Sequence, residues 1–394
     1  MNNPIVVTFK NTFLLWFLLS VFFINPSMAQ IKVGAAQTES YLPLIRGKKI
    51  GVVAHASSLI INNGKSVHLI DSLLAHNIDI KKVFAPEHGF RSEADNGEDF
   101  ENTIDPKTQL PLISLHGKHK KPQPEDLKDI DVIVFDIQDV GVRFYTYLST
   151  LHLVMEACAE NNISLLILDR PNPNAHYVDG PVLENEFKSF LGMHNVPIVY
   201  GLTLGEYAKM INEEGWLKNK IKCKFEIIPI KNYTHKTPYS LAVRPSPNLP
   251  NDTSVNLYPS LCLLEQTPVS IGRGTEMQFQ IYGHPDFKNE TFYFKPQPNF
   301  GAKYPKQEDV ICYGTDLRKE KRLDKIEIKW LLNAYEMILD KEKFFFDGFK
   351  RIAGTNTLQQ QIEMGLSEEK IRASWKPKLE HFKKMRSKYL LYED

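Results

Sequence analysis

Side chains that can move protons or hold charges follow four short apolar runs in the first half of the chain. Carboxyl and imidazole groups act as acids and bases, and an arginine can grip an anion with two parallel hydrogen bonds. The runs, with the groups that follow them, are residues 50–53 with His55, residues 83–84 with Glu87 and His88, residues 132–137 with Gln138 and Asp139, and residues 164–168 with Asp169 and Arg170. Chemistry requires these groups to meet, so the elements that carry them must share one edge of the fold.

The apolar runs are typical of parallel strands that are covered on both faces. Segments with helical spacing, residues 67–76 and 148–161, lie between them in the positions of crossover helices. A fifth strand is predicted at residues 225–230. Because open parallel sheets bind ligands outside the carboxyl ends of their strands, we expect all four groups to face one pocket. The predicted fold class is α/β, with a Rossmann-like parallel sheet.

Nucleotide cofactors and metals are not expected. The turn after the first strand, residues 54–58, contains no glycine, so the GxGxxG fingerprint is absent, and no Walker sequence occurs. No HExxH motif or comparable metal-ligand spacing occurs either. The formal net charge is +1, whereas proteins that bind nucleic acid usually carry a strong excess of positive charge, so nucleic-acid binding is not expected. We therefore expect a small-molecule site without a cofactor.

The composition changes at residues 241–259, where prolines alternate with asparagines. Proline disrupts helices and interior strands, so we predict an ordered, non-helical connection between two domains. Beyond it lie a β-like stretch at residues 277–282 and helical patterns at residues 325–340 and 367–389. A capping box beginning at Thr203 predicts a further helix that extends to Trp216, with Glu206 as a cap and not a catalytic acid. We predict a Rossmann-like domain at residues 30–255 and a smaller α/β domain at residues 256–394.

Residues 1–29 have the features of a secretory signal peptide. Lys10 precedes an apolar stretch at residues 13–24, and Ser27-Met28-Ala29 fits a small-x-small cleavage site. The stretch is shorter than the roughly 20 residues that span a bilayer. We expect an exported protein, periplasmic or secreted, without a stable membrane anchor. The four cysteines have no CxxC spacing; buried free thiols are favoured, although a bridge is possible in an oxidising compartment.

The acids fit hydrolysis of a glycosidic bond, in which one carboxyl protonates the leaving oxygen and another acts as base or nucleophile. Glu87, between a strand end and a turn, is the candidate proton donor, and an ion pair with Arg91 or Arg143 is its alternative role. Asp139 is the candidate second acid. Asp136 alternates with apolar residues, which indicates a buried structural acid.

Aromatic and cationic side chains could bind a sugar. Tyr145 and Tyr147 could stack against the face of a sugar ring. Arg143, Arg170 and Arg273 are candidates for holding an anionic substituent, with an ion pair as the alternative for each.

Several blocks of the sequence together resemble the signature blocks of the NamZ family of exo-β-N-acetylmuramidases. They are APEHGFR at residues 85–91, FDIQDVG at 135–141, RFYTY at 143–147, LDRPNP at 168–173, PSPNLP at 245–250 and GRGT at 272–275. The match covers nearly the whole chain after residue 29. Two departures stand out: the first strand turn reads His55-Ala56-Ser57-Ser58, and Gln280 replaces a glutamate that is common in the family, a loss for which Glu276 could compensate.

The resemblance implies a Rossmann-like domain, a smaller C-terminal domain and an active site between them, with Glu87 as the catalytic residue. It implies release of N-acetylmuramic acid (MurNAc) from the non-reducing end of peptidoglycan fragments, with muropeptides or MurNAc-containing disaccharides as partners. That sugar carries a lactyl carboxylate, which an arginine could bind with two parallel hydrogen bonds. A non-catalytic periplasmic protein that binds muropeptides or sugars is the alternative. The expected substrate-binding residues are His55, His88, Arg91, Gln138, Arg143, Tyr145, Tyr147, Arg170, Asn172, Asn248, Arg273 and Glu276.

Overall fold

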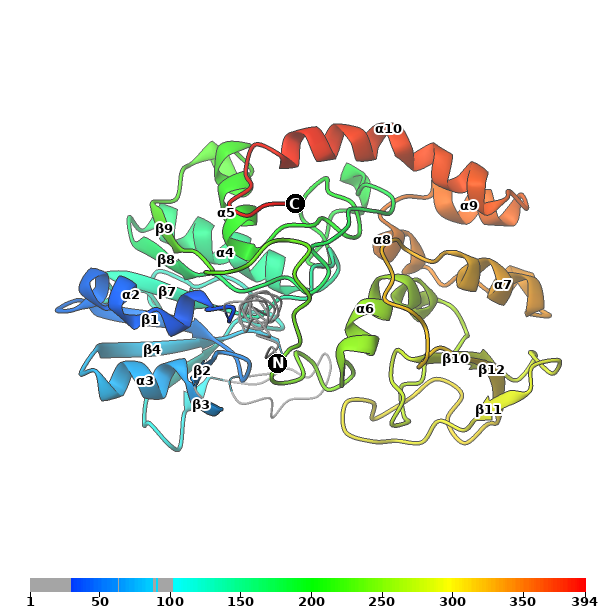
Figure 1. Ribbon diagram of the computed structural model, residues 1–394, viewed down its shortest axis with the longest axis horizontal. Helices are drawn as coiled ribbons and strands as arrows, with labels where there is room; N and C mark the ends of the chain where they lie inside the picture. The colour runs from blue at the N-terminus through cyan, green and yellow to red at the C-terminus, as the bar shows by residue number, and fades with distance from the viewer. Residues whose placement is uncertain (1–29, 63, 88–89, 91–101) are drawn as a thin grey trace, which may run out of the picture. The chain divides into compact units, whose positions relative to one another are not determined.

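The computed structural model describes residues 30–62, 64–87, 90 and 102–394 (Figure 1). Residues Lys32–Asp394 form one compact unit, to which the following description applies. The predicted signal peptide lies outside the described residues. So do two of the predicted site residues, His88 and Arg91.

A seven-stranded sheet forms the centre of the first half of this unit. Its strand order is β5-β6-β4-β1-β7-β8-β9, and every neighbouring pair is parallel except β5 with β6. The strands are β1 (Lys49–Ala54), β4 (Asp79–Ala85), β5 (Thr103–Ile104), β6 (Pro111–Ser114), β7 (Val132–Asp136), β8 (Ser164–Leu168) and β9 (Phe225–Ile228). The predicted α/β class and all five predicted strands are confirmed.

Alternating side chains divide each central strand between two apolar cores. Ile133 and Phe135 of β7 belong to the core that contains α4 (Tyr147–Glu160) and α5 (Leu204–Glu213). Val132 and Val134 belong to the core that contains α2 (Thr38–Ile45) and α3 (Leu69–Ala75). Because both faces are covered, the strands are apolar throughout, and this is the pattern that made them recognisable.

Local sequence explains where two of these helices begin. The predicted capping box is present: the Thr203 hydroxyl accepts from the Glu206 backbone N–H, and the Glu206 carboxylate accepts from the Thr203 N–H. Glu206 is therefore a cap, as expected. Helix α3 begins only at Leu69, because residues 65–68 form β3 (Lys65–His68), the second strand of a hairpin with β2 (Leu59–Asn62).

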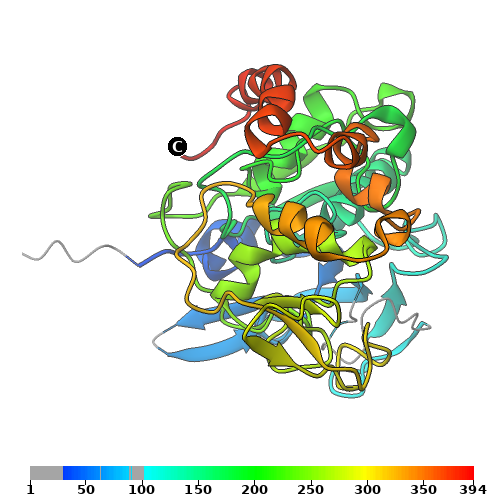
Figure 2. The same cartoon turned by 90° about the vertical axis from the view of Figure 1, so that its right-hand side faces the viewer.

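The second half of the unit contains a small antiparallel sheet and a series of helices (Figure 2). The sheet has the order β10-β12-β11, with β10 (Ile281–His284), β11 (Phe292–Phe294) and β12 (Cys312–Asp316). The helices are α6 (Asp252–Leu261), α7 (Lys329–Met337), α8 (Phe349–Ala353), α9 (Thr357–Glu363) and α10 (Glu368–Arg386). Short 3-10 helices are η1 (Gly34–Ala36), η2 (Asn185–Phe187), η3 (Lys218–Lys220), η4 (Cys262–Gln266) and η5 (Lys341–Lys343). The predicted β-like stretch at residues 277–282 becomes a strand only at Ile281, because Phe279 has a positive φ of 53°.

The prediction of a non-helical connection at residues 241–259 is wrong from Asp252 onward. Asn251 caps helix α6, its side chain accepting from the Ser254 N–H. Pro259 lies inside this helix and cannot donate to the carbonyl of Val255, four residues earlier. The side-chain amide of Asn174 donates to that carbonyl instead, at 3.0 Å. A contact from a distant segment thus replaces the hydrogen bond that proline removes.

The end of the chain is tied to the first sheet. Tyr392 donates to Asp169 at 2.6 Å, and Asp394 pairs with His235 at 2.7 Å and with Arg386 at 2.6 Å. All four cysteines are buried free thiols, as favoured from the sequence. No helix in the part of the chain that the structure describes is long and apolar enough to cross a membrane.

Candidate active site

Glu87 follows strand β4, and its side chain is half-buried. The hydroxyl of Thr146 donates to Glu87 Oε2 at 2.8 Å, and the hydroxyl of Tyr147 lies 3.4 Å from the Glu87 carbonyl oxygen. Among the described residues, Glu87 Oε1 accepts no hydrogen bond, and it is not buried. One carboxylate oxygen is thus anchored and the other is open. The ion pair with Arg143 that was the alternative for Glu87 does not form, and Arg91 lies outside the described residues.

Glu87 lines a cavity of about 210 Å³. Segments that are far apart in sequence form its wall, from the RFYTY block to helix α6, η4 and the loop before β10. The lining residues are Glu87, Phe144, Tyr145, Thr146, Tyr147, Leu191, Ser246, Leu249, Tyr258, Cys262, Glu265, Gln266, Arg273, Phe279 and Ile352. Tyr145, Tyr147 and Tyr258 pack edge to face, with ring centroids 4.8 Å and 6.1 Å apart. An acid, a cation and aromatic faces therefore meet at one hollow, as a sugar site requires.

Arg273 and Glu265 form an ion pair on the wall of this cavity. Arg273 Nε donates to Glu265 Oε1 at 2.7 Å, and its guanidinium carbon lies 5.1 Å from the centre of the Phe279 ring. Burial acts to raise the pKa of Glu265, but the positive charges of Arg273 and Lys306 outweigh it and hold that pKa below its ordinary value. The cavity thus contains an ionised carboxylate as well as Glu87.

Asp139 does not line the cavity, although it was the predicted second acid. It is buried; Asp139 Oδ2 accepts from the Gly141 N–H at 2.6 Å and from the Tyr200 hydroxyl. Its Oδ1 is buried without a hydrogen bond in the described part of the chain. Burial raises the pKa of Asp139 to about 7, partly offset by the hydroxyl of Tyr200. These contacts hold the loop after β7.

Arg143 is fully buried and structural. Its two Nη groups donate to four backbone carbonyls, at 2.8–3.0 Å, that belong to Pro181, Val196, Ile352 and Ala353. Because these donors bind backbone carbonyls of the protein itself, the structure does not support the prediction that Arg143 binds an anionic substituent.

Arg170 pairs with Asp136 in a bidentate ion pair. Nε and Nη2 of Arg170 donate to the two carboxylate oxygens at 2.5 and 2.9 Å, and both side chains are buried. Asp136 is therefore a structural acid, as predicted, and its partner is Arg170. We expected the polar side chains that follow all four apolar strands to face one pocket. This expectation is wrong for this cavity, because of those side chains that the structure describes only Glu87 lines it.

The other predicted site residues lie away from the cavity wall. Gln138 and Asn172 are buried and donate to backbone carbonyls of Pro171 and Leu202. His55 contacts the hydroxyl and the backbone N–H of Ser57, and Asn248 donates to the Gly301 carbonyl. Glu276 is exposed. Gln280, the departure from the family pattern, is buried and accepts from Asn251. The cavity thus brings together Glu87, Tyr145, Tyr147 and Arg273 of the predicted set.

Comparison with known proteins identifies the family. The model of the exo-β-N-acetylmuramidase NamZ N-terminal domain matches residues 50–253, and that of the C-terminal domain matches residues 256–392. The chain belongs to the NamZ family. It is 37% identical over 376 residues, 89% of each chain, to the peptidoglycan β-N-acetylmuramidase NamZ of Bacillus subtilis. Two crystal structures of DUF1343 family proteins from Bacteroides fragilis are also similar. The first is 42% identical with a TM-score of 0.86, and the match covers 93% of this chain and 100% of the other. The second is 28% identical with a TM-score of 0.80, and the match covers 92% of this chain and 99% of the other.

Thr146, Tyr258 and Glu265 are among the lining residues of the cavity at Glu87 that the sequence did not predict. Thr146 stands inside the RFYTY block, so its proximity to the tyrosines could have drawn attention to it. Glu265 stands alone in an apolar stretch, and its cationic partners come from residues 8 and 41 positions later in the chain. No local spacing could have revealed it.

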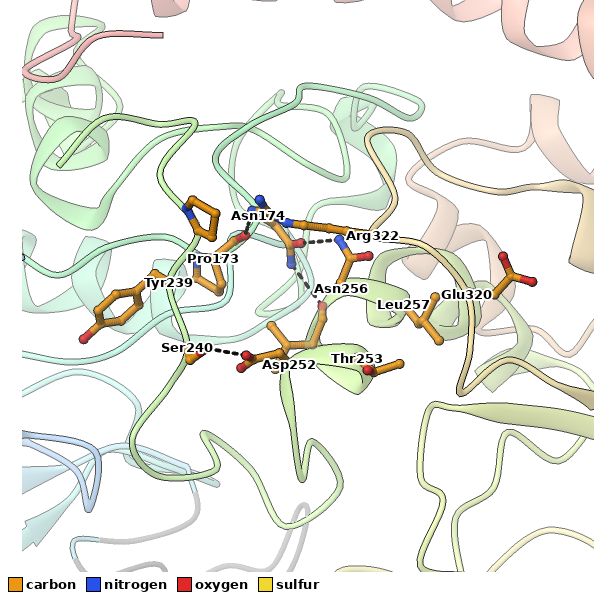
Figure 3. Close-up of a pocket in the computed structure, with 12 residues that line it drawn as sticks. Pro173, Asn174, Tyr239, Ser240, Asp252, Thr253, Asn256, Leu257, Glu320 and Arg322 are labelled. Atoms are coloured by element: carbon orange, nitrogen blue, oxygen red, sulfur yellow. Dashed lines mark hydrogen bonds between the residues drawn. The ribbon is translucent and has the colours of Figure 1, made fainter. Parts of the chain in front are cut away.

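A second cavity, of about 180 Å³, lies beside the first turns of helix α6 (Figure 3). Ser240 donates to Asp252 there, and Asn256 donates to the side chain of Asn174 at 3.2 Å. None of the predicted site residues lines it. The cavity at Glu87 is therefore the better candidate for the active site of this family member.

Proposed function

We propose that this chain is an exo-acting glycosidase that releases MurNAc from the non-reducing end of peptidoglycan fragments. Family membership and the similarity to a peptidoglycan β-N-acetylmuramidase support this activity. A non-catalytic sugar-binding protein, the alternative from the sequence, is not favoured by the same comparisons. The observation that carries the proposal is a glutamate with one anchored and one open oxygen, facing a cavity lined by tyrosines.

Glu87 is the proton donor in this proposal. Thr146 fixes one oxygen of its carboxyl group, so the other can be directed at the glycosidic oxygen. Protonation of that oxygen lets the bond to C1 of the sugar break without expelling an alkoxide. Tyr145 and Tyr147 would form an apolar wall beside the sugar that excludes water.

Arg273 is the cation for the lactyl carboxylate. Of the three arginines proposed from the sequence, it alone lines the cavity, since Arg143 and Arg170 bind the protein itself. Glu265 engages its Nε, while its two Nη groups make no hydrogen bond to described residues and are not buried. Such a planar fork matches a carboxylate. This contact would distinguish MurNAc from N-acetylglucosamine (GlcNAc), which lacks the lactyl group.

Export and the division into two domains are also proposals. Residues 1–29 carry the features of a signal peptide, so the mature periplasmic or secreted chain should begin at Gln30 without a stable membrane anchor. N-terminal sequencing of the exported protein tests this. The two family models meet at residues 253–256, which supports a domain boundary there.

Glu87→Gln tests the activity with a MurNAc–GlcNAc disaccharide, a muramide whose leaving group needs protonation. Glutamine keeps the size of the side chain but carries no acidic proton, so kcat should fall by about 10²–10⁴-fold. Binding of MurNAc, followed by calorimetry, should survive. Wild-type protein that binds MurNAc and never cleaves the muramide would support the sugar-binding alternative instead.

A further inference from the structure

Glu265 shares the cavity with Glu87, whereas Asp139 does not. Arg273 holds Glu265 Oε1 at 2.7 Å. Glu265 Oε2 accepts no hydrogen bond from the described residues, and the Glu265 side chain is 21% exposed. Both glutamates line the same cavity, and each has one oxygen anchored by a side chain and one that accepts no hydrogen bond from the described residues.

The surroundings of the two carboxyl groups differ in charge. Thr146, a neutral hydroxyl, anchors Glu87. Glu265 faces the guanidinium of Arg273, and the ammonium of Lys306 lies close by, donating to the backbone carbonyls of Leu264 and Glu265. Positive charge favours the ionised form of Glu265. Glycosidases need such a division, with one carboxyl group protonated and the other ionised.

We propose that Glu265 is the second catalytic carboxylate of this enzyme, the ionised partner of Glu87. The assignment rests on the proposed function. Glu87 gives its proton to the departing glycosidic oxygen as the bond from that oxygen to C1 breaks. The negative charge of Glu265 stabilises the positive charge that develops at C1. The oxygen of a water molecule then bonds to C1, and the proton it releases returns to Glu87.

Glu265→Gln tests the assignment through the pH profile of kcat/KM on a MurNAc–GlcNAc disaccharide. The wild-type profile should fall on the acidic side, where Glu265 takes up a proton, and Glu265→Gln should lose that limb. Its kcat should drop by at least about 100-fold with KM changed less than about threefold. Glu265→Asp keeps the charge and should retain the acidic limb at reduced kcat. This variant keeps the test valid if the glutamine protein does not fold.

Two further variants complete the design. Glu308→Gln removes an exposed glutamate outside the cavity wall and should leave the whole profile unchanged. Asp139→Asn removes the rival carboxyl and should leave the acidic limb in place. If Glu265→Gln keeps the limb, or Asp139→Asn abolishes it, Glu265 is not the second carboxylate. If the wild type releases no MurNAc, both the proposed function and this inference are wrong. If the wild type is active and the variants fail to behave as described, only the inference about Glu265 is wrong.

Discussion

Replacement of Arg143 by methionine tests whether this arginine holds the fold or the substrate. Burial lowers the pKa of Arg143 well below its ordinary value, to about 9, and at 1.36 kcal/mol per pKa unit the penalty for burying the charge is about 5 kcal/mol. Four hydrogen bonds from a charged donor contribute about 1.5–3 kcal/mol each, or about 6–12 kcal/mol together. The stabilisation outweighs the penalty.

We therefore expect Arg143→Met to lower the free energy of unfolding by about 3–5 kcal/mol, since methionine also removes the guanidinium donors from four buried carbonyl groups. Urea denaturation followed by circular dichroism measures this. Arg318→Met, at an exposed arginine paired with Asp316, should leave the free energy of unfolding unchanged within error. The folded fraction of Arg143→Met should keep the KM of the wild type. Unchanged stability with a raised KM for MurNAc substrates would refute the structural role and restore Arg143 as the lactyl contact.

Three other predictions follow from single contacts. Thr146→Val removes the hydroxyl that anchors Glu87 and should lower kcat/KM by about 10–100-fold, whereas Thr146→Ser should stay within a few-fold of wild type; equal activity of the two variants would contradict the anchoring role. Burial raises the pKa of Asp139 in the folded protein to about 7, above its unfolded value of 3.8. The protonated side chain therefore contributes its full stabilisation to the fold below pH 3.8, and this contribution is lost as the pH rises to 7. Between pH 5 and pH 8 the wild type should therefore lose about 2–3 kcal/mol of unfolding free energy relative to Asp139→Asn, as measured by urea titrations. A difference between the two proteins that stays constant with pH would contradict the burial argument. Tyr392→Phe removes the hydroxyl that donates to Asp169 and accepts from the Ile230 N–H, and should cost about 1–3 kcal/mol in thermal unfolding; no change would show that the C-terminal residues are not anchored there.

The sheet could be predicted because its signal is local. Strands covered on both faces are apolar at every position, so residues 132–136 and 164–168 are recognisable without knowledge of their neighbours. The strand ends then place Glu87 at the correct edge of the fold. The capping box at Thr203 is equally local, since its two hydrogen bonds join residues three positions apart.

The roles of charged residues could not be predicted in this way. Whether Arg143 faces a ligand or four carbonyls depends on residues up to 210 positions away. Helix α6 tolerates Pro259 only because Asn174 supplies the missing donor. Glu265 becomes a candidate only when the fold brings it to the wall that Glu87 shares. Composition and spacing carry no trace of such contacts.

Product analysis of a MurNAc-terminated glycan tests the central claim most directly. Wild type and Glu87→Gln are incubated with a peptidoglycan oligosaccharide that is labelled at its reducing end, and the products are separated by chromatography. Wild type should release free MurNAc and leave a labelled chain with GlcNAc at its non-reducing end, while Glu87→Gln should leave nearly all of the substrate intact. Release of MurNAc by Glu87→Gln at the wild-type rate, or internal cleavage without free MurNAc, would contradict the account.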